Sequence, residues 1–203
     1  MSQTICLALT GASGLPYGLR LLECLLEAGC RVQLLYSQAA QVVARQELNF
    51  ELPSRPSEAR TALLARFPTV NAEKLSVYGR EEWFAPVASG SNPPDAMVVC
   101  PCSMGTLASI AQGLSDNLIE RAADVVLKEG RKLVLVPRET PFSAIHLENM
   151  LRLTRAGAVI LPPSPGFYHH PQSVQDIVDF VVARILDQLR VPHTLMQRWG
   201  DDR

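Results

Sequence analysis

The chain has 203 residues, of which 47% are hydrophobic and 19% are charged. This length suggests one domain of roughly 150 residues or one with a modest insertion, and the hydrophobic content excludes an intrinsically disordered chain. The 19 Lys and Arg side chains against 20 Asp and Glu give a formal net charge of -1, which leaves no basic excess for binding nucleic-acid phosphates.

The first half of the chain alternates short apolar runs with helical patterns. Residues 4–10 predict a buried strand, and leucines at helical spacing then predict a helix that starts near Pro16 and stops at Gly29. Residues 31–36 predict a second strand, after which Ser37 can cap a helix that runs to residue 47. Six prolines break up residues 48–95, whose only good helical pattern is 58–67. We therefore expect 48–95 to be an elaborated connection.

The second half repeats the alternation. Strands are expected at 96–100, 133–136 and 158–161, and helices at 103–111, 116–129 and 143–155. Ser173 opens the last helix, with Asp176 three residues on, as in a variant of the capping box. Continuous apolar strands that alternate with helices predict an α/β fold of three layers, with helices on both faces of a mostly parallel sheet. We expect residues 1–203 to form a single domain with a C-terminal tail at 190–203.

The sequence has few features of a secreted or membrane protein. The first apolar run, at 5–9, is short and follows no Lys or Arg, unlike a signal peptide. No apolar stretch approaches the roughly 18 residues that a membrane span needs, and no basic cluster flanks an amphipathic helix. The five cysteines lack a disulfide-framework spacing and are expected to be reduced. We expect a soluble, cytoplasmic protein.

Ligands of parallel sheets bind beyond the carboxyl ends of the strands, so the residues that follow each strand are the candidate site. Gly11, Ala12, Ser13 and Gly14 follow the first strand. Glycines allow close approach to a ligand, and the next helix offers free N–H groups. The segment matches neither the dinucleotide G-x-G-x-x-G pattern nor a Walker A loop. A tight turn without a ligand and a cofactor loop are both compatible with it. Ser37, after the second strand, can serve as a helix cap, a ligand contact or both.

Hydroxyl groups also follow the strand at 96–100. Ser103 and Thr106 open a helix beside Gly105, an arrangement that suits a phosphate as well as simple capping. Cys102 could be a nucleophile, but no base is placed near it, and buried structural cysteine is the commoner case. Cys100 and Cys102 are too closely spaced for an ordinary zinc site.

Charged and aromatic residues follow the last two strands. Arg138 and Glu139 come after 133–136, where the alternatives are a surface ion pair or groups that bind an oxyanion and move a proton. A proline-rich loop at 162–171 presents Tyr168. His169 and His170 are adjacent and point different ways, so we expect no metal there.

Three cations lie on predicted helices. Arg121 and Lys128 are seven residues apart, on one helical face about 10 Å from each other. Asp124 lies between them, so a solvated salt-bridged face is an alternative to an anion site. Arg184 is surrounded in sequence by Val and Ile, and a cation in such surroundings favours an anionic partner.

Five ordered segments resemble one family, the UbiX flavin prenyltransferases. The segments are 11–14 (GASG), 100–106 (CPCSMGT), 117–124 (NLIERAAD), 135–141 (LVPRETP) and 165–168 (PGFY). The likeness covers essentially the whole chain, while residues 48–80 contribute little to it. The resemblance implies a Rossmann-like fold and a homo-oligomer, with a dodecamer as the expected size.

The resemblance also implies an activity. Members of this family transfer a dimethylallyl group from dimethylallyl phosphate to N5 and C6 of reduced FMN. The product, prenylated FMN, serves a UbiD-type decarboxylase in ubiquinone biosynthesis or aromatic-acid decarboxylation. The implied cofactor is thus FMN, whose reduced form is a substrate, and no metal is implied.

Site residues follow from the same resemblance. The implied FMN contacts are Gly11, Ala12, Ser13, Ser37, Ser103, Met104, Gly105, Thr106 and Arg138. The implied substrate-binding residues are Arg121, Lys128, Glu139, Tyr168, Arg184, Trp83 and Trp199. The implied catalytic residues are Ser13, Glu47, Lys128 and Glu139. The segment 197–200 is the expected place for a mobile cover.

Two other functions remain as alternatives. One is an FMN-dependent cysteine decarboxylase of the same fold, although the Pro-Ala-Ser-Ala-Asn-Thr segment of that group is not found here. The other is a non-catalytic FMN-binding carrier, which would have no need of Arg121, Lys128 or Glu139.

Overall fold

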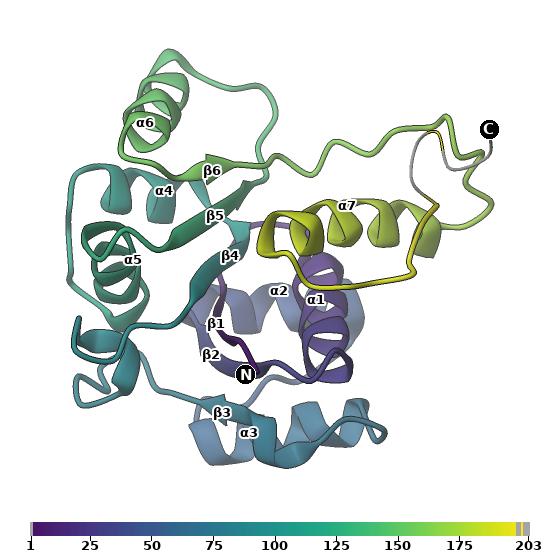
Figure 1. The fold of residues 1–203 in the computed structure, drawn as a ribbon, viewed down its shortest axis with the longest axis horizontal. Helices are drawn as coiled ribbons and strands as arrows, with labels where there is room; N and C mark the ends of the chain where they lie inside the picture. Colours follow the sequence, from purple (N-terminus) through teal and green to yellow (C-terminus); the bar gives the residue numbers. More distant parts are fainter. Residues whose placement is uncertain (1, 198–199, 201–203) are drawn as a thin grey trace.

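A parallel sheet forms the centre of the computed structural model, which describes residues 2–197 and 200. The strands lie in the order β3-β2-β1-β4-β5-β6, and every neighbouring pair is parallel (Figure 1). Their bounds are β1 Thr4–Leu9, β2 Arg31–Tyr36, β3 Leu75–Val77, β4 Ala96–Cys102, β5 Lys132–Pro137 and β6 Val159–Ile160. The expected α/β class with a parallel sheet is confirmed.

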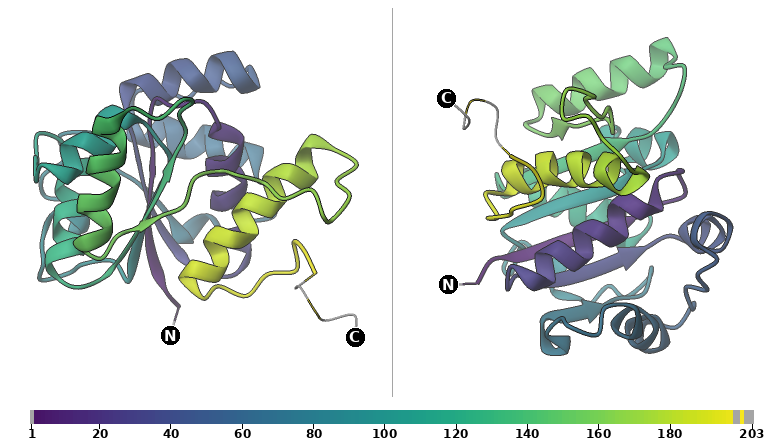
Figure 2. Two further views of the ribbon diagram at one scale, coloured as in Figure 1. Left: turned by 90° about the horizontal axis from the view of Figure 1, so that it is seen from above. Right: turned by 90° about the vertical axis from the view of Figure 1, so that its right-hand side faces the viewer.

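Helices cover both faces of this sheet, as Figure 2 shows from above in its left panel. The α-helices are α1 Leu15–Glu27, α2 Gln38–Leu48, α3 Pro56–Arg66, α4 Met104–Ala111, α5 Leu118–Lys128, α6 Ala144–Arg155 and α7 Val174–Leu189. Side chains of α1, α2, α3 and α7 share one apolar cluster with the sheet, and side chains of α4, α5 and α6 share a second. The expected three layers are therefore present.

The central strands are apolar throughout because both of their faces are buried. In β1, Ile5, Leu7 and Leu9 point into the first cluster, while Cys6 and Ala8 point into the second. This is the two-residue alternation of a strand, applied to a sheet that has no solvent face. Such a rigid core fixes where the loops at the strand ends begin.

The region 48–95 contains more regular structure than the sequence predicts. Besides α3, it holds two 3₁₀ turns, η1 (Ala72–Lys74) and η2 (Pro86–Ala88), and the edge strand β3, which pairs with β2 through Val32 opposite Leu75. We did not predict β3, because its three residues are too few to give a periodic signal. Strand β4 also continues two residues past the predicted end, through Pro101 to Cys102.

Helix α1 approaches the sheet closely at Gly18. A side-chain carbon at this position would overlap the carbonyl oxygen of Cys100 and lie 2.6 Å from Cδ2 of Leu9. We expect Gly18→Ala to destabilise the fold by about 1–3 kcal/mol through overpacking, although Ala is the better helix former. Urea unfolding measures the change. Gly79→Ala is the control, because the added carbon there would meet Pro56 at an ordinary 3.6 Å. Equal stability of the two variants would contradict the close approach.

Candidate functional site

The candidate site lies at the carboxyl edge of the sheet, where the loops after β1, β2, β4 and β5 lie next to one another. Two hydrogen bonds join neighbouring strand ends: Ser37 N–H donates to the carbonyl of Leu9 (2.9 Å), and Arg138 N–H donates to the carbonyl of Cys102 (3.3 Å). Helix α2 lies across this edge (Figure 2, left). Gly11 packs so closely on α2 that an added side-chain carbon would overlap Ala39.

A cavity of about 290 Å³ opens beside these loops. It is lined by Ser37, Gln38, Ala39, Arg80, Thr106, Asn117 and Ile119. Ser37 caps α2 by accepting from Ala40 N–H (3.1 Å), and Asn117 caps α5 by accepting from Ile119 N–H (3.0 Å). Thr106 belongs to the first turn of α4. Three helix starts therefore face one space, together with Arg80.

This donor set fits a phosphate group. N–H groups at helix starts and an arginine are the groups that bind phosphate oxygens in proteins. The structure brings Ser37 and Thr106 together, as the resemblance implied. At Gly105, an added side-chain carbon would meet no atom within 4 Å, so there is open space beside α4. The tail of FMN therefore suits the residues present.

Five of the cavity residues were missing from the sequence-based set: Gln38, Ala39, Arg80, Asn117 and Ile119. Asn117 belongs to 117–124, one of the segments that carry the family resemblance. Its position as the cap of a helix that begins at residue 118 could have identified it as a site residue. Arg80 lies in the irregular connection, where no periodic pattern marked it. Its carbonyl accepts from Leu118 N–H (2.8 Å), which ties the connection to the start of α5.

The glycine loop is joined to the end of α2 by Glu47. The Glu47 carboxylate accepts hydrogen bonds from Gly14 N–H (3.0 Å) and Leu15 N–H (2.9 Å). Gly14 is the first residue before α1, has a φ of 108° and provides no side-chain cap of its own. A carboxylate from another helix thus satisfies the start of α1, where negative charge is favourable. The contact places the Glu47 carboxylate at the peptide bond that joins Ser13 to Gly14, and the catalytic roles of Glu47 and Ser13 remain predictions.

Arg138 and Glu139 also lie at this edge, directly after β5. Arg138 is exposed, and Glu139 is half-buried and accepts from Thr140 N–H through Oε1 (3.0 Å). Among the ion pairs of residues 2–197 and 200 there is none between Arg138 and Glu139. The alternative that these two residues form a surface ion pair with each other is therefore not supported. Their proposed roles in binding and catalysis remain predictions.

Lys128 lies at the opposite edge of the sheet. Helix α5 begins at the cavity and runs for 11 residues, about 16 Å at 1.5 Å per residue, before the chain turns into β5. Lys128 Nζ pairs with Glu129 at 2.6 Å. Within one chain, therefore, Lys128 is not gathered with Ser13 and Glu47.

Arg121 is held in the first half of α5. Its Nη1 pairs with Asp124 (2.9 Å), and its Nε donates to the carbonyl of Ala88 (3.0 Å). The salt-bridged face that we considered from the spacing is therefore present for Arg121 and Asp124, while Lys128 pairs elsewhere. The phosphate-binding role of Arg121 remains a prediction.

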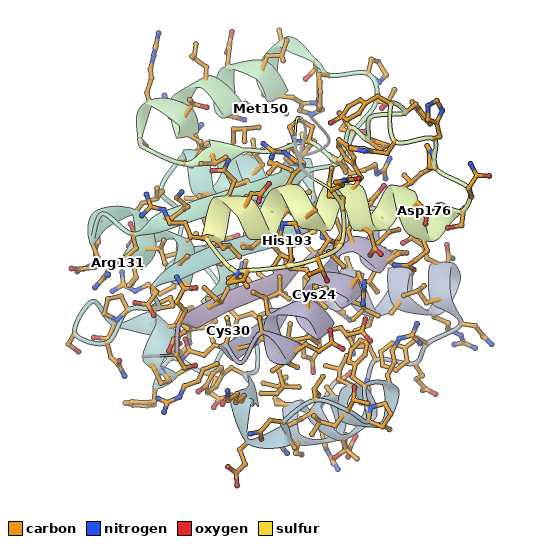
Figure 3. All side chains as sticks on the ribbon, turned by 45° about the vertical axis from the view of Figure 1, so that its right-hand side comes forward. Cys24, Cys30, Arg131, Met150, Asp176 and His193 are labelled. Carbon is orange, nitrogen blue, oxygen red and sulfur yellow. The ribbon has the colours of Figure 1, made fainter. Side chains whose placement is uncertain are left out.

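Arg184 has the anionic partner that the sequence favoured, but its side chain does not lie in apolar surroundings. Its apolar neighbours, such as Val182 and Ile185, are buried, but the Arg184 side chain is 52% exposed and pairs with Asp187 at 2.7 Å. Helical periodicity turns the arginine away from the core face that its neighbours occupy. Asp187 Oδ1 also lies 3.2 Å from Nε2 of His193. His193 belongs to the segment that runs back beneath α7 (Figure 3).

The aromatic candidates Tyr168 and Trp83 are not among the residues that line this cavity. Tyr168 packs edge-on against Phe180 of α7, with ring centroids 5.9 Å apart. The same loop helps to line a second space of about 290 Å³, together with Leu195 and Met196 of the tail. Trp83 is 45% exposed in the connection before β4. Trp199 lies outside the described residues, as does part of the expected cover at 197–200.

The cysteines are buried and unpaired by disulfides. Burial raises the pKa of Cys102 to about 12 and that of Cys24 to about 11. A thiol with so high a pKa holds almost no thiolate at neutral pH, so Cys102 is a poor nucleophile. In residues 2–197 and 200, no three His, Cys, Asp or Glu side chains are grouped to hold a metal. None of the helices in these ranges has the length and apolar character that a membrane-spanning helix requires.

Comparison with known proteins agrees with this geometry. The family model described as Flavoprotein matches residues 1–186, so the chain is a flavoprotein. The flavin prenyltransferase UbiX of Pseudomonas aeruginosa is 57% identical over 199 residues, which cover 98% of this chain and 95% of that protein. The UbiX of Methanocaldococcus jannaschii is 44% identical, over 97% of this chain and 98% of that one. The chain belongs to the UbiX flavin prenyltransferase family.

Solved structures give the same result. AnUbiX (PadA1), crystallised with FMN and dimethylallyl pyrophosphate, has a TM-score of 0.87 and 41% identity, with 98% of both chains covered. A dodecameric FMN-dependent UbiX-like decarboxylase from Escherichia coli has a TM-score of 0.85 and 43% identity, over 97% of this chain and 99% of that one. A PPC decarboxylase, at 18% identity and a TM-score of 0.57, shares the fold alone.

Proposed function

We propose that this chain transfers the dimethylallyl group of dimethylallyl phosphate to N5 and C6 of reduced FMN. The observation that carries the proposal is the match over 98% of the chain to AnUbiX, which was solved with FMN and dimethylallyl pyrophosphate. The cavity at the carboxyl edge supports it, because its donors suit the phosphate of FMN. The whole chain is proposed to act as one domain.

The residues of the chain would bind and orient both partners. Ser37 and Thr106, with Arg80 and the start of α5, would hold the phosphate of FMN, and Gly11 to Ser13 would follow the flavin along the loop after β1. Arg138, exposed at the end of β5, adds a cation at the same edge. Bound reduced FMN supplies the nucleophilic nitrogen and the ring carbon that receive the allyl group.

The remaining charged residues would serve the reaction itself. The bond between the allyl carbon and the phosphate oxygen must break, so negative charge grows on the phosphate in the transition state. Preorganised cations such as Arg121, Lys128 and Arg184 stabilise such charge without a metal. Glu47 and Glu139 would move protons, and the faces of Tyr168 and Trp83 would surround the allyl cation.

Lys128 reaches that site only from another copy of the chain. In one chain it lies at the edge of the sheet opposite Ser13, whereas the proposed chemistry needs both near one flavin. A homo-oligomer resolves this, and the dodecameric relative gives a precedent for its size. Phe84, fully exposed, and the exposed Ile145, Leu147 and Leu151 of α6 offer apolar surface for such contacts. We also propose that the chain is cytoplasmic and that a UbiD-type decarboxylase is the recipient of its product.

The proposal is tested by incubating the protein without oxygen with reduced FMN and dimethylallyl phosphate. We expect a flavin with a new absorption spectrum and the added mass of one five-carbon isoprene unit. Oxidised FMN is the control and should give none. FMN binding without this product would favour the carrier alternative, and decarboxylation of a cysteine-ended peptide would favour the decarboxylase. A parallel reaction with the diphosphate establishes the preferred donor.

A further inference from the structure

The hydroxyl of Thr10 connects the end of β1 to the start of α4, whose Thr106 lines the cavity. Thr10 follows β1 directly and is only 1% exposed. Its Oγ1 donates to the carbonyl of Pro101 (2.8 Å) and accepts from Ser103 N–H (2.8 Å). Its own N–H also donates to the Pro101 carbonyl (3.3 Å). One buried side chain therefore fixes the end of β1 against the end of β4.

The second of these contacts leads to the cavity. Ser103, whose N–H the Thr10 hydroxyl accepts, is the N-cap of α4, and its Oγ accepts from Thr106 N–H (3.2 Å) and donates to Thr106 Oγ1 (3.0 Å). Thr106 in turn lines the cavity. Three hydroxyl residues thus form a continuous hydrogen-bonded series from the core to the cavity wall.

We infer that Thr10 is a positioning residue for the FMN phosphate, acting through Ser103 and Thr106. The inference rests on the function proposed above and assigns a role to a residue outside the implied contact set. The buried Thr10 hydroxyl already donates to Pro101 and accepts from Ser103, so it acts on the ligand through α4. Removing it leaves the Ser103 N–H without its acceptor and frees the first turn of α4 to move. Valine has the shape of threonine without the hydroxyl, whereas serine keeps the hydroxyl without the methyl group.

The experiment compares Thr10→Val, Thr10→Ala and Thr10→Ser in the full-length protein. Affinity for oxidised FMN is measured by fluorescence quenching, and stability by urea unfolding. We expect Thr10→Val and Thr10→Ala to bind FMN roughly tenfold more weakly, and Thr10→Ser to bind it like the wild type. Prenylation should show a higher KM for FMN and a nearly unchanged kcat, because Thr10 touches no reacting atom. Thr154→Val is the matched control: its hydroxyl bonds to Met150 within α6, far from the cavity.

The outcomes separate this inference from the proposed function. Failure of the wild type to bind FMN would count against the function itself. If the wild type binds FMN and Thr10→Val and Thr10→Ala bind it with the same affinity as the wild type, the positioning role is overturned. The role is also overturned if Thr10→Ser binds FMN as weakly as Thr10→Val and Thr10→Ala do, because the loss of the methyl group would then explain the weaker binding. If Thr10→Val does not fold, the comparison of Thr10→Ala with Thr10→Ser decides, because these two differ in the hydroxyl alone.

Discussion

Replacing Glu47 with Gln should lower the rate of prenyl transfer by about 10²–10⁴-fold, the range for losing a general acid or base. The fold should survive, because the amide oxygen of Gln can still accept from Gly14 N–H and Leu15 N–H, which bond the carboxylate at 3.0 and 2.9 Å. What is lost is a group that can take up and release a proton beside Ser13. Single-turnover prenylation at saturating reduced FMN measures the effect, with unfolding followed in parallel.

A matched control separates chemistry from charge. Glu51→Gln removes an exposed carboxylate four residues further along the chain and should leave turnover unchanged. Wild-type turnover in Glu47→Gln would show that Glu47 serves only to cap α1. Loss of both FMN binding and cooperative unfolding would show instead that the capping contact is indispensable to the loop.

Lys128→Ala should also reduce prenyl transfer strongly, by about 10²–10³-fold, as when one preorganised group that stabilises transition-state charge is removed. FMN binding should persist, because the cavity proposed for FMN lies at the other end of α5. Steady-state kinetics with varied dimethylallyl phosphate provide the measurement. Arg131→Ala, which removes an exposed cation at the same edge as Lys128, is the control and should remain active.

The position of Lys128 makes a sharper form of this test available. If one chain provides Glu47 and another provides Lys128, co-assembly of Lys128→Ala with Glu47→Gln should create fully intact sites. At equal amounts and random assembly, about a quarter of the sites would be intact. Recovery of activity from two inactive variants is the expected result. A mixture no more active than its components would contradict the assignment of Lys128 to a neighbouring site.

The sequence predicted what depends on local patterns. The buried strands β1, β2 and β5, the cap at Ser37 and the capping box at Ser173 all follow from neighbouring residues, and each was found within one or two residues of its predicted place. The order of the strands and the side on which each helix packs depend on distant contacts. Even so, the rule that parallel strands share a carboxyl edge was enough to bring Ser37 and Thr106 to one place.

What was missed depends on tertiary context. Strand β3 exists because β2 offers it an edge, not because three residues favour a strand. Arg80 reaches the cavity because its carbonyl is tied to Leu118 of a later helix. Arg184 was placed in apolar surroundings because its sequence neighbours are apolar, although the helix turns it outward. In each case the deciding contact joins residues that sequence spacing does not relate.

Helix α5 starts at the cavity proposed for the flavin and ends at Lys128, at the opposite edge of the sheet. The same helix therefore borders the cavity of its own chain and carries Lys128, the cation that we assign to the site of a neighbouring chain. When the protein is diluted until the oligomer dissociates, FMN binding and turnover should therefore respond differently. The separated chains would still bind FMN, while the turnover per chain would fall. Specific activity would then rise with protein concentration, even when both substrates are saturating.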